Sequence, residues 1–277
     1  MITLNGEPVE IGSFPDRTIL MKCPKVAGGR IEWKYESDRE FIALIYLVKH
    51  LRSAGCPAIT LYMPYIPNAR MDRVESSDDV FTLKYFSEIL NSLELDHITV
   101  LDPHSTVSTA LINNCHVETP EKYIKMAIDR IPVWTYVNYD HMSFHYEERV
   151  MPSLLIFYPD AGAMSRYSKL ISGPYAYGLK KRDWETGKII GLDIIDNGLH
   201  LSGKDILIVD DICSKGGTFL HSARKLKELG ARDIYLYVSH CENTILEGDL
   251  LTSGLIKKVF TTDSIFTKEH EKIEVLK

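Results

Sequence analysis

The chain lacks long apolar runs and an excess of basic residues. None of its 277 residues fall in an uninterrupted apolar stretch long enough to cross a membrane, which takes about 18 residues or more. Lys and Arg number 32 against 38 Asp and Glu, and the net charge is -6. A protein that coats nucleic acid needs a basic surface to neutralise phosphates. We therefore expect neither a nucleic-acid partner nor a membrane partner.

Paired cysteines are missing as well. The five cysteines are widely spaced, and no CxxC pair occurs, so neither a zinc site nor a disulfide framework is indicated. Isolated cysteines are typical of reduced thiols in a cytosol. The first six residues lack the basic and apolar segments of a signal peptide. These absences predict a cytoplasmic protein.

What the chain does contain is an alternation of short apolar runs with longer amphipathic stretches. Helical spacing and run length predict helices over 38–54, 81–93 and 219–229, and strands over 58–63, 98–101, 154–158, 206–209 and 234–239. Strand, polar loop, helix and strand in this order are typical of a mainly parallel sheet flanked by helices. Ligands of such sheets bind at the carboxyl ends of the strands.

The segment 130–151 interrupts this rhythm. It is rich in aromatic residues, from Trp134 to Tyr146, and its sheet periodicity is unclear. We interpret it as the connection between two α/β halves. The sequence then predicts two domains, 1–148 and 149–277.

The most specific motif follows the predicted strand 206–209. Asp210 and Asp211 come at its end, and a loop with Gly216 and Gly217 then opens a helix. Backbone N–H groups at a helix N-terminus can hold a phosphate, and glycine lets the oxygens approach closely. Carboxylates can accept hydrogen bonds from the hydroxyls of a neighbouring sugar.

This motif resembles the ribose phosphate loop that type I phosphoribosyltransferases share with phosphoribosyl pyrophosphate (PRPP) synthetases. The resemblance implies an α/β fold of two tandem type I phosphoribosyltransferase-like domains. It also implies that ribose phosphate is bound by Asp210, Asp211, Ser214, Lys215, Gly216, Gly217 and Thr218.

Further segments are similar to PRPP synthetases alone, and they occur in that family's order. They are residues 14–16, 64–73, 101–104, 158–163, 180–182 and 261–265. The resemblance implies that ATP is bound by Phe14, Asp16, Arg70, Asp72, Arg73 and His104. It places His104 and Asp160 at the Mg²⁺ ion, and it gives His104, Lys180 and Arg182 catalytic roles, the last two on a flexible loop.

The activity implied is that of an ATP-dependent diphosphokinase. The C1 hydroxyl of ribose 5-phosphate attacks the β-phosphorus of ATP, which gives PRPP and AMP. Charge develops on phosphoryl oxygens in the transition state, and cationic side chains with Mg²⁺ can stabilise it. The family resemblance further implies a homo-oligomer, either a dimer or a hexamer.

Several positions depart from the family pattern. Ser214-Lys215 stands where Asp-Thr is usual, the stretch 74–79 is acidic where the family is basic, and residues 105–109 replace a Gln-rich word. Arg17-Thr18 stands where Gly-Glu is common, and the sequence stops at Lys277, before the family's usual C-terminal helix. These departures concern adenine contacts, allosteric control and assembly.

Three alternatives stay open at this stage. Lys215 could serve a 5-substituted ribose such as ADP-ribose as acceptor. The loop alone would also suit a phosphoribosyltransferase that consumes PRPP. A non-catalytic subunit associated with PRPP synthetase is the third, although Lys180, Arg182, His104 and Asp160 are all present.

Overall fold

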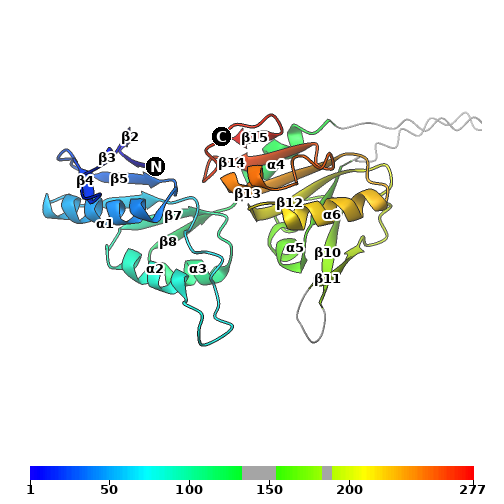
Figure 1. The fold of residues 1–277 in the computed structure, drawn as a ribbon, viewed down its shortest axis with the longest axis horizontal. Coiled ribbons are helices and arrows are strands. Elements are labelled where there is room, and N and C mark those ends of the chain that lie inside the picture. The colour runs from blue at the N-terminus through cyan, green and yellow to red at the C-terminus, as the bar shows by residue number, and fades with distance from the viewer. Residues whose placement is uncertain (133–153, 183–188) are drawn as a thin grey trace, which may run out of the picture. The chain divides into compact units, whose positions relative to one another are not determined.

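The computed structural model describes residues 1–132, 154–182 and 189–277, and for residues 180–182, 189, 190 and 192 it describes the backbone alone. The chain divides into two compact units, Met1–Pro120 and Glu121–Lys277. Each unit contains its own sheet (Figure 1). Among the helices of these ranges, none combines the length and apolar character that a membrane crossing requires.

The first unit has a six-stranded sheet in the order β2-β1-β5-β6-β7-β8. β5 to β8 are parallel, and β1 runs antiparallel to both of its neighbours. The strands are β1 (Ile2–Leu4), β2 (Glu7–Pro8), β5 (Gly29–Trp33), β6 (Ile59–Tyr62), β7 (His97–Leu101) and β8 (Cys115–Glu118). A separate antiparallel hairpin joins β3 (Ile11–Ser13) to β4 (Ile19–Met21).

Three helices belong to this unit: α1 (Asp38–Ser53), α2 (Thr82–Asn91) and α3 (Thr106–Leu111). α1 buries Leu44, Leu47, Val48 and Leu51, which is the helical spacing of one apolar face. Alternate residues of β5 and β6, such as Ile31 and Leu61, are buried in the same core. The buried face of each strand, formed by alternate residues, therefore packs with the apolar face of the helix in one core.

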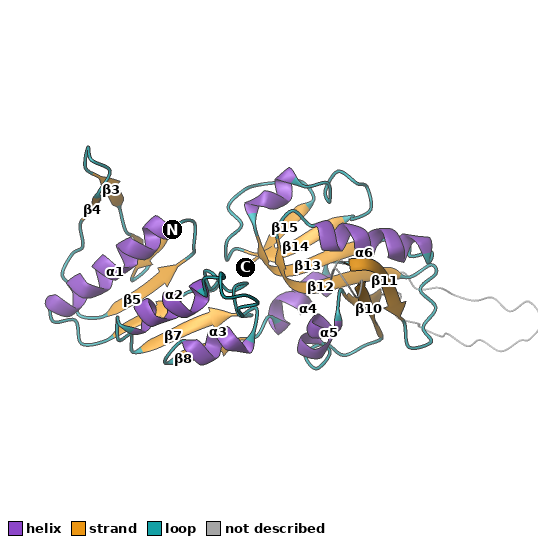
Figure 2. Cartoon of the chain, turned by 60° about the horizontal axis from the view of Figure 1, so that its bottom comes forward, coloured by secondary structure: helices purple, strands orange, loops and turns teal. Residues whose placement is uncertain are grey.

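The second unit has a seven-stranded sheet in the order β11-β10-β9-β12-β13-β14-β15. All pairs are parallel except the β10–β11 hairpin. The strands are β9 (Leu154–Tyr158), β10 (Tyr175–Arg182), β11 (Ile189–Ile195), β12 (Asp205–Cys213), β13 (Ile234–Cys241), β14 (Lys258–Thr262) and β15 (Ile273–Leu276). The helices are α4 (Glu121–Asp129), α5 (Ala161–Tyr167), α6 (Gly217–Glu228) and the 3-10 helix η1 (Asn243–Glu247). Figure 2 shows this sheet with helices beside it.

The centre of this sheet explains its apolar sequence. Every residue of β13 is buried, as expected of a parallel strand that has neighbours on both sides and helices over its faces. α6 packs Phe219, Ala223 and Leu226 into the same core. The helix is followed by Gly230, whose φ of 86° is the left-handed conformation that ends many helices.

The predicted α/β class and every strand and helix predicted above are confirmed, with ends that differ by a few residues. One prediction about β12 is wrong. The strand does not end before Asp210, because its pairing with β13 continues to Cys213 and Cys241. Asp210 and Asp211 therefore lie within the carboxyl-terminal part of the strand, where backbone pairing fixes both carboxylates.

The predicted domain boundary near residue 148 lies outside the described residues. The second compact unit begins at Glu121, because α4 packs against β13, β14 and β15. Just after α4, Arg130 forms an ion pair with Glu274 of β15. The first part of the predicted connection 130–151 is thus tied to the second sheet.

Candidate functional site: two carboxylates and a glycine loop

The site begins where β12 leads into α6. Gly216 occupies the N-cap position of α6 with a φ of 81°, which only glycine adopts without strain. Gly217 and Thr218 form the first turn and are exposed. The first N–H groups of a helix have no partner within the helix, so this end of α6 offers N–H donors to an anion.

The two aspartates just before the loop differ in environment. Asp211 is 3% exposed and accepts a hydrogen bond of 3.1 Å from Nη2 of Arg166. Asp210 keeps 18% of its side chain exposed, lies 3.9 Å from the same guanidinium nitrogen, and accepts the N–H of Asp211 at 3.0 Å. Burial, and next the charge of Asp211, raise the pKa of Asp210 well above its ordinary value of 3.8. Asp210 is thus the more accessible acceptor, and Asp211 is buried and bonded to Arg166.

Arg166 is a site residue that the sequence analysis missed. It lies on α5, which follows the neighbouring strand β9, and it contacts both carboxylates of β12. One cation between two adjacent buried anions offsets much of their repulsion. The signal available in the sequence was a single arginine in a helix that begins at the carboxyl end of an adjacent strand.

Replacing Arg166 by glutamine is expected to lower the free energy of unfolding at pH 7 by about 2 kcal/mol, because it leaves buried carboxylates without their cation. The raised pKa of Asp210 means that protonation relieves this repulsion. The deficit should therefore shrink as the pH is lowered through the titration of the pair. Urea unfolding at pH 7 and pH 5 measures both effects, with the exposed Arg224→Gln as control; a deficit that stays constant with pH would contradict the assignment.

Gly248 and Leu250, which follow η1, pack against the loop. A Cβ atom on Gly216 would lie 2.7 Å from Cδ2 of Leu250, and a Cβ atom on Gly248 would collide with the backbone carbonyl of Lys215. Leu250 itself is fully buried. Gly248 was also missed from the sequence, because its requirement comes from a backbone more than thirty residues earlier in the chain.

Polar contacts join the same two segments. Oγ of Ser214 lies 3.1 Å from Oγ1 of Thr244, and Thr244 donates to the carboxylate of Glu242 at 3.0 Å. Nζ of Lys215 lies 3.3 Å from Oε2 of Glu247. Among the predicted phosphate-binding residues, Ser214 and Lys215 therefore contact η1, Gly216 is the N-cap of α6, and Gly217 and Thr218 begin that helix.

In the first unit, a second group of predicted residues meets at the ends of β6 and β7. Met63 donates its N–H to Thr99 at 2.9 Å, and Leu101 donates to the carbonyl of Pro64 at 3.0 Å. The segments 64–73 and 101–104 therefore start side by side at the carboxyl edge of this sheet. Asp102 is buried with a φ of 41°, so the chain turns sharply just before His104.

The predicted ATP-binding residues differ in exposure. His104 and Asp72 are partly buried, and Arg70 is exposed. Arg73 lies 3.5 Å from Glu75, with 79% of each side chain exposed, so this ion pair contributes little stability. Both arginines thus have exposed side chains on the loop that follows β6.

Phe14 and Asp16 lie on the connection between β3 and β4. Phe14 is 49% exposed. Oδ1 of Asp16 accepts hydrogen bonds from the N–H and the hydroxyl of Thr18, which lower its pKa. Nη2 of Arg39 donates to the carbonyl of Gly12 at 2.6 Å, which ties the hairpin to α1.

Asp160, a predicted metal ligand, is the N-cap residue of α5 and accepts the N–H of Ala163 at 3.0 Å. Within the described ranges, no group of three or more His, Cys, Asp or Glu side chains gathers as a metal site. The predicted catalytic residues Lys180 and Arg182 have their backbone in β10, paired with β11, rather than in a loop. Their side chains lie outside the described residues.

The segment 261–265 has a structural role that the structure makes plain. The hydroxyls of Thr262 and Ser264 both donate to the carbonyl of Ser239, at 2.6 and 3.1 Å. Nδ1 of the buried His240 lies 2.8 Å from Oγ of Ser264. Because the Ser264 hydroxyl donates to Ser239, it accepts from Nδ1 of His240. These bonds hold the carboxyl end of β13 to the segment that follows β14.

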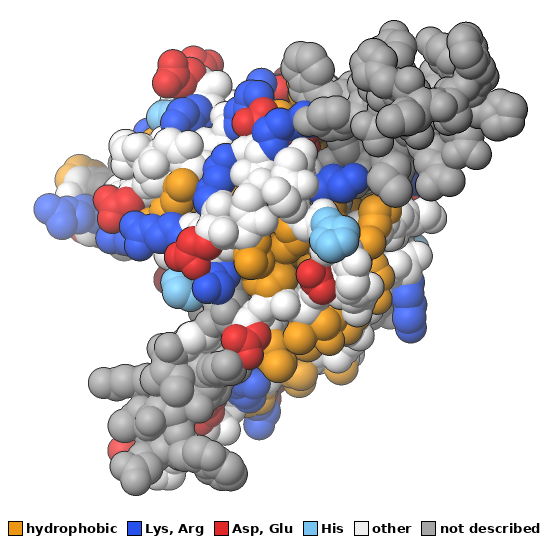
Figure 3. All heavy atoms as spheres, turned by 90° about the vertical axis from the view of Figure 1, so that its right-hand side faces the viewer, with side chains coloured by type: hydrophobic (Ala, Val, Ile, Leu, Met, Phe, Trp, Pro, Cys, Tyr) orange, Lys and Arg blue, Asp and Glu red, His pale blue; other side chains and the backbone are white. Residues whose placement is uncertain are grey.

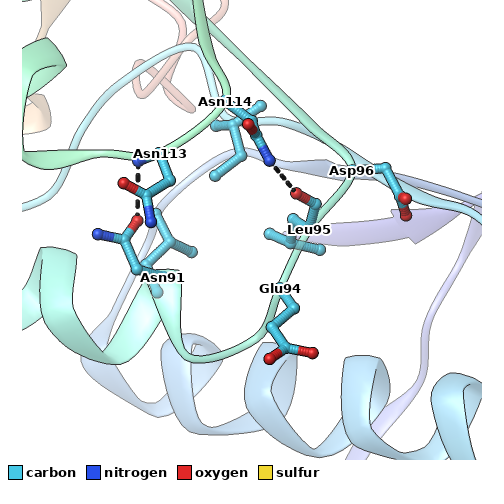
Figure 4. Close-up of a pocket in the computed structure, with 8 residues that line it drawn as sticks. Asn91, Glu94, Leu95, Asp96, Asn113 and Asn114 are labelled. Atoms are coloured by element: carbon cyan, nitrogen blue, oxygen red, sulfur yellow. Dashed lines mark hydrogen bonds between the residues drawn. The ribbon is translucent and has the colours of Figure 1, made fainter.

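Two further surface features lie outside the predicted site. In the first unit, a hollow of about 330 Å³ lies at the amino ends of β7 and β8. This is the edge of the first sheet opposite to segments 64–73 and 101–104. There, Asn91 accepts the N–H of Asn113 and Asn114 donates to the carbonyl of Leu95 (Figure 4), so these amides stabilise turns. On the face in Figure 3, acidic and basic side chains are interspersed around apolar ones.

The fold and the loop together define the class of protein. The chain consists of two α/β units in tandem, and the second carries a pair of aspartates near the end of β12 and a glycine loop that leads into α6. The phosphoribosylpyrophosphate synthetase of Mycobacterium smegmatis shares this fold, with a TM-score of 0.73 over 97% of this chain and 85% of that one, at 16% identity.

Curated proteins that share one name match the chain over most of its length. The chain is 27% identical over 268 residues to the ribose-phosphate pyrophosphokinase of Sulfurisphaera tokodaii, covering 93% of this chain and 84% of the relative. It is 26% identical over 276 residues to that of Pyrococcus abyssi, covering 97% and 87%. With the Saccharolobus solfataricus protein of the same name, 27% identity extends over 74% of this chain and 65% of the relative's length. No family model matches the chain. The chain is thus similar, over most of its length, to proteins named ribose-phosphate pyrophosphokinase.

Proposed function

We propose that this protein is an ATP-dependent ribose-phosphate diphosphokinase that converts ribose 5-phosphate and ATP into PRPP and AMP. The observation that carries the proposal is the combination of the Asp210–Asp211 pair with the glycine loop at the N-terminus of α6. The chain that holds them is similar to ribose-phosphate pyrophosphokinases over most of its length. A ribose phosphate has hydroxyl donors that suit the aspartates and a phosphate anion that suits the helix N-terminus. The five cysteines are free thiols, which agrees with the proposed cytoplasmic location.

Each part of the site has a proposed task. The N–H groups of Gly217 and Thr218 bind the 5-phosphate, and Asp210 accepts from the ribose hydroxyls. Arg70, Asp72, Arg73 and His104 bind ATP, together with Phe14 and Asp16, which in an oligomer would reach a neighbouring copy. Lys180 and Arg182 stabilise the charge that develops on the transferred group.

Mg²⁺ is the proposed metal. In phosphoryl transfer this ion is commonly held by one or two carboxylates, water and the phosphates of the substrate. A single carboxylate at the carboxyl end of β9, as Asp160 provides, fits that donor set, and His104 is the second proposed ligand. When bound, the ion supplies charge neutralisation at the phosphate oxygens.

The direct test is an assay of the purified protein with ATP and ribose 5-phosphate. We expect AMP and PRPP in equal amounts, and no AMP after chelation of divalent ions. ADP-ribose, the alternative acceptor suggested by Lys215, and a nucleobase with PRPP are run in parallel. If AMP release required ADP-ribose, the acceptor would be wrong. Pyrophosphate release from PRPP and a base without ATP would identify a phosphoribosyltransferase instead.

A further inference from the structure

The segment that follows β13, residues 242–250, covers the phosphate loop. Glu242 donates its N–H to the carbonyl of Cys213 at 2.8 Å, immediately before the loop. Gly248 packs on the backbone of Lys215, and Leu250 packs on Gly216. Ile245 and Leu250 are fully buried. We call residues 242–250 the covering segment, and its packing fixes the backbone on both sides of Glu247.

The covering segment also makes polar contacts with two loop side chains. The single hydroxyl hydrogen of Thr244 is donated to Glu242, so at the 3.1 Å contact with Ser214 the hydrogen comes from Ser214. The ammonium of Lys215 faces the carboxylate of Glu247 at 3.3 Å. Among the loop side chains that could donate to a phosphate, those of Ser214 and Lys215 thus already donate to the covering segment.

The ion pair of Lys215 and Glu247 is open to exchange. Their side chains are 65% and 62% exposed, and water and counterions weaken such a pair. A phosphate monoester carries a charge of about -1.5 to -2 and three strong acceptor oxygens. At the N-terminus of α6 it is further favoured by the helix dipole. A monoester dianion can therefore outcompete the carboxylate for Lys215.

We propose that Glu247 is a specificity-determining residue that competes with the 5-phosphate of the sugar for Lys215. This inference rests on the proposed function, because it deepens the role of the same loop. The carboxylate, held near the loop by the buried packing of Ile245 and Leu250, lowers the affinity for every anion. A substituent binds well only when its charge approaches that of a full phosphate monoester.

The test is a double-mutant cycle on the KM for ribose 5-phosphate at saturating ATP. Glu247→Gln removes the competitor, so KM should fall about threefold with kcat unchanged, which is the range of an exposed ion pair. Lys215→Gln removes a charge-assisted hydrogen bond to phosphate, so KM should rise about tenfold. In the double variant KM should equal that of Lys215→Gln, since the two side chains compete for one partner.

The matched control is Glu228→Gln. Glu228 lies at the other end of α6 and pairs with Lys225 at 2.8 Å, so its loss should leave KM unchanged. An unaltered KM in Glu247→Gln overturns the inference. So does a threefold fall that persists without Lys215, because Glu247 would then act only through its general field.

A second measurement separates this inference from the proposed function. If the wild-type protein releases no AMP with ribose 5-phosphate, the proposed function fails, and calorimetric binding of inorganic phosphate replaces KM. Tighter phosphate binding by Glu247→Gln, abolished in the Lys215→Gln background, supports the inference even then. Equal phosphate binding by the wild type and Glu247→Gln overturns it.

Discussion

Asparagine in place of Asp210 is expected to make the folded chain more stable and to remove most of its activity. The pKa of Asp210 is raised well above 3.8 by burial and by the charge of Asp211, so the ionised form is disfavoured in the folded state. Asparagine has nearly the same shape and keeps an oxygen for the N–H of Asp211, but it carries no charge. It cannot replace a carboxylate that accepts charge-assisted hydrogen bonds from ribose hydroxyls.

The pH dependence of this effect has a definite sign. In the folded state Asp210 binds its proton more tightly than in the unfolded state, so its contribution to stability is full below pH 4 and is lost as the pH rises through the folded-state pKa. Asp210→Asn removes that loss, so at pH 7 we expect the variant to be more stable than the wild type, and the difference should shrink as the pH is lowered. The value of kcat/KM for ribose 5-phosphate should fall about 100-fold. Urea unfolding from pH 4.5 to 8 and initial-rate kinetics measure the two quantities.

Asp205, at the other end of the same strand, is the matched control. It is 1% exposed and accepts two hydrogen bonds from Arg232, the Nε bond being 2.8 Å long. Asp205→Asn breaks a buried ion pair and should cost about 3 kcal/mol, while the folded fraction keeps its kinetic constants. A loss of stability in Asp210→Asn similar to that in Asp205→Asn would show that position 210 serves the fold.

Two adjacent glycines should respond to alanine in opposite ways. Gly216→Ala must hold a left-handed φ of 81° with its Cβ 2.7 Å from Leu250, which cannot move away because it is fully buried. Left-handed strain and overpacking together should lower the free energy of unfolding by about 3 kcal/mol. Thermal and urea unfolding measure this loss.

Gly217→Ala provides the contrast. No atom lies within 4 Å of a Cβ built there, and alanine favours a helix, so stability should be kept or rise by a few tenths of a kcal/mol, about the helix-propensity gain at a terminus. The added methyl group would stand where a phosphate approaches the backbone. We expect the KM for ribose 5-phosphate to rise about tenfold, on the order of one lost charge-assisted hydrogen bond. An unchanged KM would mean that the phosphate does not bind at this end of α6.

Much of the fold could be predicted because local and tertiary preferences agree. The helix over 38–54 is predicted from six apolar residues at helical spacing. Four of them are buried in α1, whereas Phe41 and Ile45 are half-buried. The strand over 154–158 is reproduced by β9. In both cases the apolar pattern that selects the element also forms the core, so no competing structure satisfies it.

The rest depends on contacts between distant segments. The continuation of β12 through Asp211 was missed because polar residues end a strand in most sequences, whereas here pairing with β13 extends the ladder. Arg166, Gly248 and Glu247 were missed because each acquires its role from residues more than thirty positions away. A one-dimensional pattern contains the phosphate loop itself but not the parts that surround it.

The grouping of α4 with the second sheet has a consequence for how the polypeptide is organised. The passage from one unit to the other falls at Pro120 and Glu121, directly before a helix. Proline restricts its own backbone and that of its predecessor, so few backbone conformations are open to the chain at this point.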